Sequence, residues 1–342
     1  MKTKSLIDVY LKIAILSTIV ILAVYYAGNI IMPILLSGVI SLILFPLVRK
    51  LNIWGIPKSL AVGLVVLLAS ASMLIVIFGI GFQTQKIISE FPEDEVEEVF
   101  DDPIQSVEDK TDVKISKYTK EIENVIEQVK SVLVEAIPSA LNRLTNTIVF
   151  FITCPIYIFF MLLYSENIRD FYLQSIKNRS RGKAFIKSLE ATYQNYVKGM
   201  LMVILIVSVL TGLGLFLLGI KYAIFIGILT GILTLIPYVG VFISASIPIV
   251  LALITKESIW YAVGVLLVYV VVQFLEGNFI TPKIVGNQVS LNPLVVIIGL
   301  VIFGAVGGVA GMIITIPVLA LIKTMANHNP SWRPLKTLIE TR

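Results

Sequence analysis

Residues 59–82, SLAVGLVVLLASASMLIVIFGIGF, contain no charged side chain. As an α-helix this stretch is about 36 Å long at roughly 1.5 Å per residue, which is enough to cross the hydrocarbon core of a bilayer with some tilt. The whole chain has the same character, because 57% of its 342 residues are hydrophobic, only 14% are charged and the mean hydropathy is +0.93. Since a soluble domain carries about 25% charged residues, the sequence predicts an all-α integral membrane protein.

The side chains needed for several kinds of chemistry are scarce. Cys154 is the single cysteine and His328 the single histidine, so we expect no disulfide framework, no histidine-based metal site and no Ser/His or Cys/His dyad. The glycine-rich run 304–311 lacks the Lys-Ser/Thr of a phosphate loop. The chain has a net charge of +5, and in a membrane protein such an excess of Lys and Arg usually lies in cytoplasmic loops. The expected protein is therefore not an enzyme, carries no metal or cofactor and binds no nucleic acid.

About eight hydrophobic segments are expected in total. The seven besides 59–82 lie at 12–27, 30–48, 144–164, 199–218, 222–254, 259–275 and 291–322. Basic residues cluster at 49–58 and 165–198, which predicts that these connections and both termini are on the cytoplasmic side of the cell membrane. The expected parts are N-terminal membrane helices (1–82), an extracytoplasmic acidic and amphipathic helical segment (83–143), a membrane helix (144–164), a basic interfacial cytoplasmic loop (165–198), a C-terminal membrane bundle with broken helices (199–323) and a cytoplasmic tail (324–342).

Two connections have an apolar face at helical spacing. The segment 83–143 has fifteen acidic and seven basic residues, and heptad-spaced apolar residues occur there at Ile115, Tyr118, Ile122, Val125, Val129, Val132 and Ala136. This helix packs either on its own bundle or membrane surface, or between the subunits of a homo-oligomer. The cytoplasmic loop has a similar series at Phe185, Leu189, Tyr193 and Tyr196. That face lies either among lipid headgroups or against the bundle.

The last third of the chain contains broken apolar segments. Pro237-Tyr238-Val239-Gly240 interrupts 222–254 and leaves two halves that are marginal for a crossing, which indicates a helical hairpin or a discontinuous helix. The segment 291–322 is too long for one straight span and contains four glycines, so we expect it to double back. Such breaks are tolerated at membrane depth only where they are buried in protein or line a wet cavity.

A polar block follows the apolar segment 259–275. Tyr269, Gln273 and Glu276 are spaced i, i+4, i+7 and share one face if the helix continues to Glu276. A carboxylate at the end of an apolar span is a candidate functional group, able to carry a proton or bind a cation. Lys283 is the nearest countercharge. The alternative is that Glu276 and Lys283 form an ion pair that only anchors the helix end.

At these positions the sequence resembles the autoinducer-2 exporter family of bacterial and archaeal membrane proteins. The matching motifs are Pro237-Tyr238-Val239-Gly240, Glu276-Gly277-Asn278, Thr281-Pro282-Lys283-Ile284-Val285-Gly286, Leu291-Asn292-Pro293-Leu294 and the glycines before Ile316-Pro317. The resemblance implies a transporter in the cytoplasmic membrane that assembles as a homo-oligomer, a pentamer being expected. Some members export autoinducer-2 and others exchange sodium or lithium for protons.

The leading hypothesis is a secondary transporter that exports a small polar solute or exchanges a monovalent cation (Na⁺ or Li⁺) for protons. Glu276 would couple transport to the ion, Lys283 would tune its charge, and Gln273, Asn278 and Asn292 would hydrogen-bond the solute or hydrated ion. The residues expected to create the breaks that permit movement are Pro237, Gly240, Pro282, Gly286 and Pro293. The alternative function is a passive pore or oligomeric scaffold, in which the polar block only anchors the bundle.

Overall fold

The structure of the protein is a computed structural model that describes residues 28, 30–90, 148–176, 178–256, 258–285, 290–328 and 332–340. The predicted span 12–27, the heptad residues of 115–136 and Gly286 lie outside the described residues.

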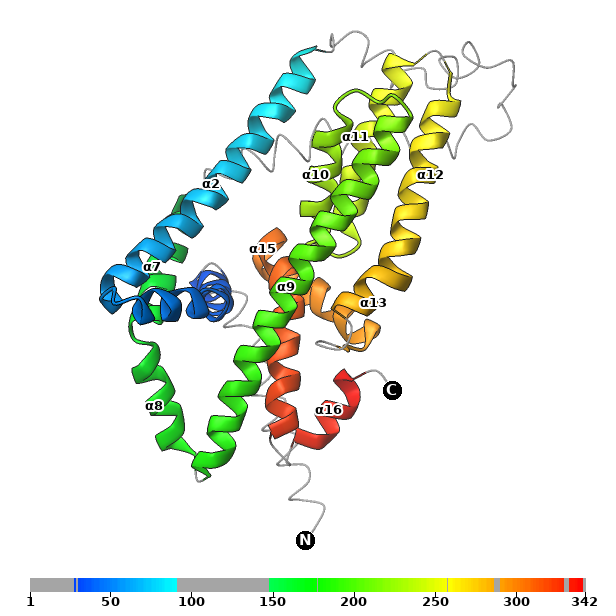
Figure 1. Ribbon diagram of the computed structural model, residues 1–342. Helices are drawn as coiled ribbons and strands as arrows, with labels where there is room; N and C mark the ends of the chain where they lie inside the picture. Colours follow the sequence, from blue (N-terminus) through cyan, green and yellow to red (C-terminus); the bar gives the residue numbers. More distant parts are fainter. Residues whose placement is uncertain are drawn as a thin grey trace. The chain divides into compact units, whose positions relative to one another are not determined.

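The described residues are helical throughout, joined by short turns (Figure 1). Five helices are long and apolar enough to cross a membrane: Ile30–Ile53, α2 (Lys58–Glu90), α9 (Arg179–Leu217), the helix Trp260–Ile284 and α15 (Pro293–His328). The shorter helices are α7 (Ile148–Leu163), α8 (Ser165–Ser175), α10 (Ala223–Leu233), α11 (Val239–Thr255) and α16 (Arg333–Ile339). No β-strand occurs in the described ranges, where a single bridge joins Leu291 to Glu340. The predicted fold class, an all-α membrane protein, is confirmed.

The chain divides into two compact units. Unit 1 comprises Met1–Val66, Phe150–Tyr193 and Ser290–Arg342, and unit 2 comprises Leu67–Val149 and Gln194–Val289. Helices α2 and α9 each contribute one part to both units. Chain segments far apart in sequence therefore share each unit, and α15 and the α10–α11 pair belong to different units.

Unit 1 is held by packing between the N-terminal membrane helices and α7. Val48, Val62 and Leu162 belong to one buried cluster that joins Ile30–Ile53, the first turns of α2 and α7. A buried hydrogen bond runs from the Ser37 hydroxyl to the Cys154 carbonyl at 3.2 Å, so the single cysteine lies inside this helix contact. In a second cluster, Met32 packs against Ile314 and Val318 in the second half of α15.

The first part of α9, which lies in the predicted cytoplasmic loop 165–198, packs against other helices of unit 1. Phe185 and Tyr193 are buried, and the Tyr193 hydroxyl donates a 2.7 Å hydrogen bond to the Pro317 carbonyl in α15. Phe185 also lies against the rings of Tyr172 and His328. The aromatic series therefore packs on the bundle at these positions, which decides between the two alternatives left by the sequence.

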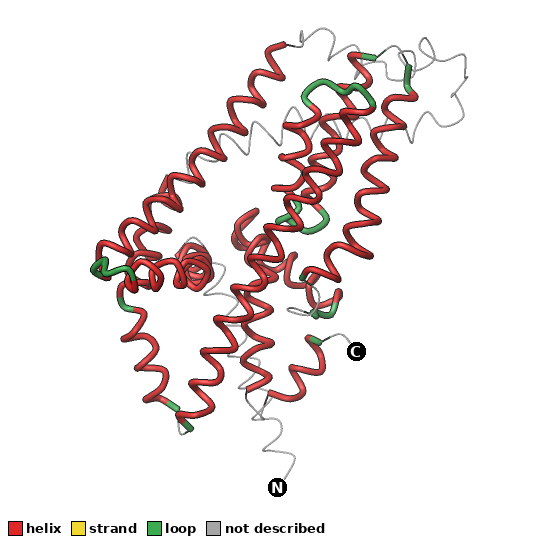
Figure 2. The backbone as a smooth tube through the Cα atoms, in the orientation of Figure 1, coloured by secondary structure: helices red, strands yellow, loops and turns green. Residues whose placement is uncertain are grey.

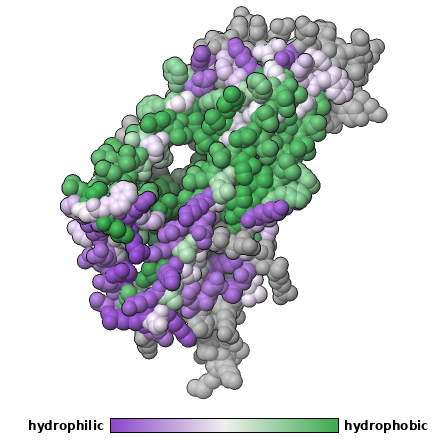
Figure 3. Space-filling view, viewed as in Figure 1, coloured by the Kyte–Doolittle hydropathy of each residue, from purple (hydrophilic) through white to green (hydrophobic). Residues whose placement is uncertain are grey.

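Unit 2 is a bundle of the second part of α9 with α10, α11 and the helix that begins at Trp260. Its core contains Leu215 from α9, Ile226 from α10, Ala252 from α11 and Val265 from α12 (Trp260–Leu275). On the face seen in Figure 3, hydrophobic side chains cover this bundle, whereas hydrophilic side chains gather over α8 and the first part of α9 in unit 1. Such an apolar face is expected where helices face lipid.

The α10–α11 segment is a helical hairpin. Its arms pack together, and the turn between them contains Pro237 and Tyr238, the latter with φ of 63° (Figure 2). A Cβ on Gly240 would lie 1.9 Å from the Leu233 carbonyl oxygen, so only glycine permits this close return. The arm α10 has 11 residues and is about 16 Å long, which is too short to cross a core of roughly 30 Å.

The helix α15 also doubles back, at Gly308, whose φ of 56° and ψ of −138° lie outside any helix. A Cβ on Gly311 would lie 1.8 Å from the Phe303 carbonyl oxygen, and one on Gly299 would lie 2.8 Å from the Thr315 side chain. In a straight helix residues eight apart are separated by about 12 Å. The predicted return of the segment 291–322 is therefore confirmed, and its two arms form a second hairpin.

Candidate functional site

The predicted polar block forms the end of a continuous membrane helix. The regular helix α12 is followed without interruption by the π-helix η2 (Glu276–Ile280) and then by α13 (Thr281–Ile284). The sequence placed the apolar segment at 259–275 and left open whether its helix continues to Glu276; the helix does continue, through Pro282 to Ile284. Pro282 therefore lies inside this helix, and its role in movement stays a prediction.

A π turn explains how the helix accommodates this proline. Proline has no N–H and its ring collides with the carbonyl four residues earlier in an α-helix. In η2 the bonding is displaced by one residue, and the Thr281 N–H bonds to the Glu276 carbonyl. The side-chain amide of Asn278 donates a 2.9 Å hydrogen bond to the Phe274 carbonyl. Single π turns inside α-helices occur frequently at functional sites.

Glu276 is the half-buried carboxylate at the start of this π turn. Its Oε1 atom accepts a hydrogen bond from the Thr281 hydroxyl at 2.5 Å, so Thr281 contacts Glu276 through both backbone and side chain. Among the described residues no ion pair joins Glu276 to Lys283, which is exposed. The anchoring ion pair considered as the alternative role of Glu276 is therefore not formed.

The depth of Glu276 follows from the packing of its helix on α9. A Cβ on Gly214 would touch Val268, and a Cβ on Gly199 would lie 3.1 Å from the Ile284 carbonyl oxygen, so the two helices run antiparallel. Glu276 lies eight residues before Ile284, roughly 12 Å along the axis. Glu276 consequently lies at the level of the apolar part of α9 and not at the helix terminus.

The other two members of the predicted stripe differ in their surroundings. Tyr269 is 3% exposed; its hydroxyl lies 2.8 Å from the Thr230 hydroxyl in α10 and donates a 2.8 Å hydrogen bond to the Ser244 carbonyl in α11. Tyr269 therefore ties α12 to both arms of the hairpin. Gln273 is half-buried, and its Nε2 atom is buried with no hydrogen-bond partner among the described residues. An unpaired buried amide calls for an explanation, and a bound solute or water is one.

The predicted residues of unit 1 have a different environment. The Asn292 N–H donates to the Ile339 carbonyl at 2.7 Å, and its Oδ1 accepts the Leu294 N–H at 3.0 Å. Asn292 thus begins α15 and holds the C-terminal segment, while Pro293 occupies the first helical position. Gln273, Glu276 and Asn278 belong to unit 2. The described ranges contain no group of three or more His, Cys, Asp or Glu side chains able to hold a metal ion.

Comparison with known proteins identifies the family. The model of the AI-2E family transporter matches residues 13–330. The chain is 28% identical to "Putative transport protein YrrI" of Bacillus subtilis over 88% of this chain and 86% of that protein. It is 24% identical to "AI-2 transport protein TqsA" of Escherichia coli, over 94% and 92% respectively. It is also 27% identical to "Putative permease PerM" of Escherichia coli, over 56% and 55%. The chain belongs to the AI-2E transporter family.

Three residues of this AI-2E family transporter escaped the sequence reasoning. Thr281, Thr230 and Ser244 provide the hydrogen-bond partners of Glu276 and Tyr269. Thr281 had a signal, since a hydroxyl immediately before Pro282 lies within reach of a carboxylate one turn earlier. Thr230 and Ser244 had none, because their contact with Tyr269 depends on the return of the hairpin.

Proposed function

We propose that this AI-2E family transporter is a secondary transporter, which exports a small polar solute or exchanges Na⁺ or Li⁺ for protons. The observation that carries the proposal is Glu276, a half-buried carboxylate at a π turn about 12 Å inside a membrane helix. Ionisable residues inside apolar spans are costly and are characteristic of ion and proton pathways. Coupling requires a group that holds either a proton or a cation, and a carboxylate does both.

The immediate neighbours of Glu276 suit this role. A carboxylate has about four lone-pair sites, and Thr281 uses one of them. Gln273 lies three residues earlier with its amide nitrogen unpaired, so it would donate to a solute oxygen near the carboxylate. Lys283, exposed one turn after the π turn, would tune the local potential. Asn278 would bind the solute only by giving up its bond to Phe274.

The hairpin α10–α11 is the moving element that we infer for unit 2. Its turn at Pro237 and its close contact at Gly240 keep the arms together, so the pair would move as one body. Tyr269 joins both arms to the helix of Glu276. Pro282, within that helix, and Pro293, at the start of the second hairpin, would define where each element can pivot; the same role for Gly286 rests on sequence alone.

Assembly, location and cargo are further parts of the proposal. We infer a homo-oligomer, a pentamer as the family resemblance implies, in the cytoplasmic membrane with both termini cytoplasmic. The name of TqsA assigns AI-2 to that relative, so autoinducer-2-like furanosyl compounds join Na⁺ and Li⁺ as the first substrates to test here.

The decisive experiment measures flux in proteoliposomes containing the purified full chain. Imposed pH, Na⁺ and Li⁺ gradients are followed with a pH-sensitive dye and ion tracers, and AI-2-like compounds by direct assay. We expect Glu276→Gln to abolish proton-coupled flux, whereas Asp170→Asn, which removes an exposed carboxylate from α8, leaves it intact. Unchanged proton-coupled flux in Glu276→Gln would remove Glu276 from the mechanism. Absence of any gradient-driven flux in the wild type, with oligomers intact, would favour the passive pore or scaffold.

Thr281 provides a second test that separates positioning from folding. Thr281→Val removes the hydroxyl donor and keeps the shape, whereas Thr281→Ser keeps the donor. We expect the valine variant to change the pH dependence of transport and the serine variant to restore it. Identical pH profiles in all three proteins would show that the contact with Glu276 has only a structural role.

A further inference from the structure

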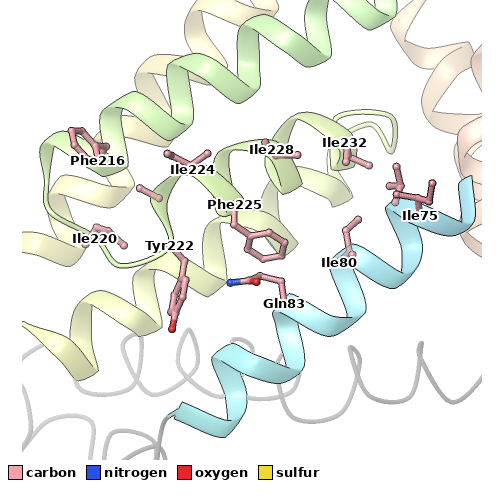
Figure 4. A pocket seen from close by; sticks show the side chains of 13 residues that line it. Ile75, Ile80, Gln83, Phe216, Ile220, Tyr222, Ile224, Phe225, Ile228 and Ile232 are labelled. Carbon is pink, nitrogen blue, oxygen red and sulfur yellow. The ribbon is translucent and has the colours of Figure 1, made fainter. Parts of the chain in front are cut away.

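Unit 2 contains a groove that the proposed transport site does not use. Its volume is about 760 Å³, within the range of roughly 300–1,000 Å³ found for small-molecule sites. One wall is the second part of α2, from Ile75 to Gln83; the other is the end of α9 with the turn and helix α10, from Phe216 to Ile232 (Figure 4). We call it the α2–α10 groove.

The walls of the α2–α10 groove are almost entirely hydrocarbon. Isoleucines project into it from both sides, and among the described residues that line it only Gln83 and Tyr222 have polar side chains with hydrogen-bonding groups. Ile75 and Ile232 lie at one end, while Gln83 and Tyr222 lie toward the other (Figure 4). A small polar solute would find few partners along such walls, since specific sites for polar ligands supply several convergent polar groups.

The length of the groove matches one leaflet of a bilayer. Eight residues of helix separate Ile75 from Gln83, and nine separate Ala223 from Ile232, which is about 12–14 Å along the axes. Half of a hydrocarbon core of roughly 30 Å is about 15 Å. The groove is also accessible from the side, because Ile75 is 72% and Ile224 69% exposed. A chain entering from the surrounding lipid would therefore fill it without leaving its leaflet.

The polar end carries positive charge. Lys86 follows Gln83 by one turn of α2, and Lys221 precedes Tyr222 with its Nζ 5.2 Å from the tyrosine ring centroid. Both lysines are exposed. An ammonium at the boundary between hydrocarbon and water attracts lipid phosphates. Along the groove, apolar side chains are followed by an amide and a phenol and then by ammonium groups. This order complements a phospholipid, in which the acyl chain is followed by the ester groups and then by the phosphate.

We propose that the α2–α10 groove binds one acyl chain of a phospholipid, whose phosphate lies at Lys221 and Lys86. The bound chain fills the space between α2 and the first arm of the hairpin. The chain thereby sets the distance between α10 and α2. The position of the hairpin then depends on which lipid occupies the groove.

The test uses the full chain in nanodiscs of phosphatidylethanolamine and phosphatidylglycerol. A trace of phosphatidylglycerol with a diazirine in the acyl chain is photo-activated, and the labelled peptides are quantified by mass spectrometry. We expect label concentrated on α10 and the second part of α2. Ile228→Trp, which fills the groove, should lower that labelling several-fold, whereas Leu205→Trp, at a 66% exposed position of α9 outside the groove, should not.

A second variant keeps the proposal falsifiable if the tryptophan disturbs folding. Lys221→Glu should lower labelling by the phosphatidylglycerol probe but not by a diacylglycerol probe with the same diazirine, and Lys187→Glu on α9 should change neither. Label spread evenly over all lipid-facing helices would mean ordinary solvating lipid and would overturn the proposal. So would loss of oligomers in Ile228→Trp with unchanged labelling, because the groove would then be occupied by a second copy of the chain.

Discussion

Gly311→Ala distinguishes a hairpin from a straight span at α15. The added Cβ would lie 1.8 Å from the Phe303 carbonyl oxygen and 2.6 Å from its carbon. Both are backbone atoms that cannot rotate away, so the two arms must separate by more than 1 Å to reach ordinary contact of about 3.4 Å. In a straight helix Phe303 would be about 12 Å away, and the same methyl would not reach it.

The two arrangements predict opposite signs for the change in stability. Overpacking of a close contact costs about 1–3 kcal/mol, while replacing glycine by alanine in a helix interior returns at most about 1 kcal/mol. Because this collision is with backbone atoms, its cost lies near the upper end of that range, and the hairpin predicts a net loss of about 2 kcal/mol, whereas a straight helix predicts a gain. The measurement is thermal unfolding of purified protein in one detergent, with Gly81→Ala as control because a Cβ there has nothing within 4 Å. An unfolding temperature of Gly311→Ala equal to or above that of wild type would refute the hairpin.

Two further predictions concern contacts within single units. Tyr269→Phe removes a hydroxyl that bonds to both arms of the α10–α11 hairpin; we expect a loss of about 1 kcal/mol in thermal unfolding, and no loss for Tyr261→Phe, whose side chain lies at a partly exposed helix start. Lys323→Ala removes a nearly buried ammonium that pairs with Glu340 at 3.2 Å. Limited proteolysis should then release α16 faster than in wild type, whereas Lys336→Ala, whose 3.7 Å pair with Glu340 is far more exposed, should change the rate little.

The hairpins could be predicted because their cause is local. Proline and glycine act on the backbone within a few residues, so Pro237 and Gly240 marked one return and the glycines around Gly308 the other. Segment length added the second half of the inference, since the two halves of 222–254 are marginal for a crossing and 291–322 is too long for one straight span. What the sequence could not provide is which glycine turns the chain: Gly308 has the non-helical φ, whereas Gly311 is needed only because the other arm returns against it.

The candidate site was harder to predict because its geometry depends on a shift of one residue. The sequence left open whether the helix continues to Glu276, and Pro282 was expected to create a break after it. Here the π turn η2 accommodates Pro282 and the helix continues for two more turns, so Glu276 lies about 12 Å before the end of the helix at Ile284. The π turn requires only a one-residue displacement of hydrogen bonds, and periodicity alone does not separate it from an α turn. The Thr281 contact with Glu276 follows from that displacement.

Tyr269 and Glu276 lie on one continuous helix, seven residues or about 10 Å apart. Tyr269 bonds to both arms of the hairpin, and Glu276 carries the charge that transport is proposed to use. If the hairpin moves relative to this helix, the two bonds of Tyr269 must break, and interhelical hydrogen bonds in membranes average only about 0.6 kcal/mol. That cost is small beside the change in free energy when a carboxylate inside a span gains or loses a proton or cation. In the proposed mechanism, loading of Glu276 would therefore decide whether the Tyr269 contacts hold, because a helix that moves as one body transmits a shift at one residue to the other.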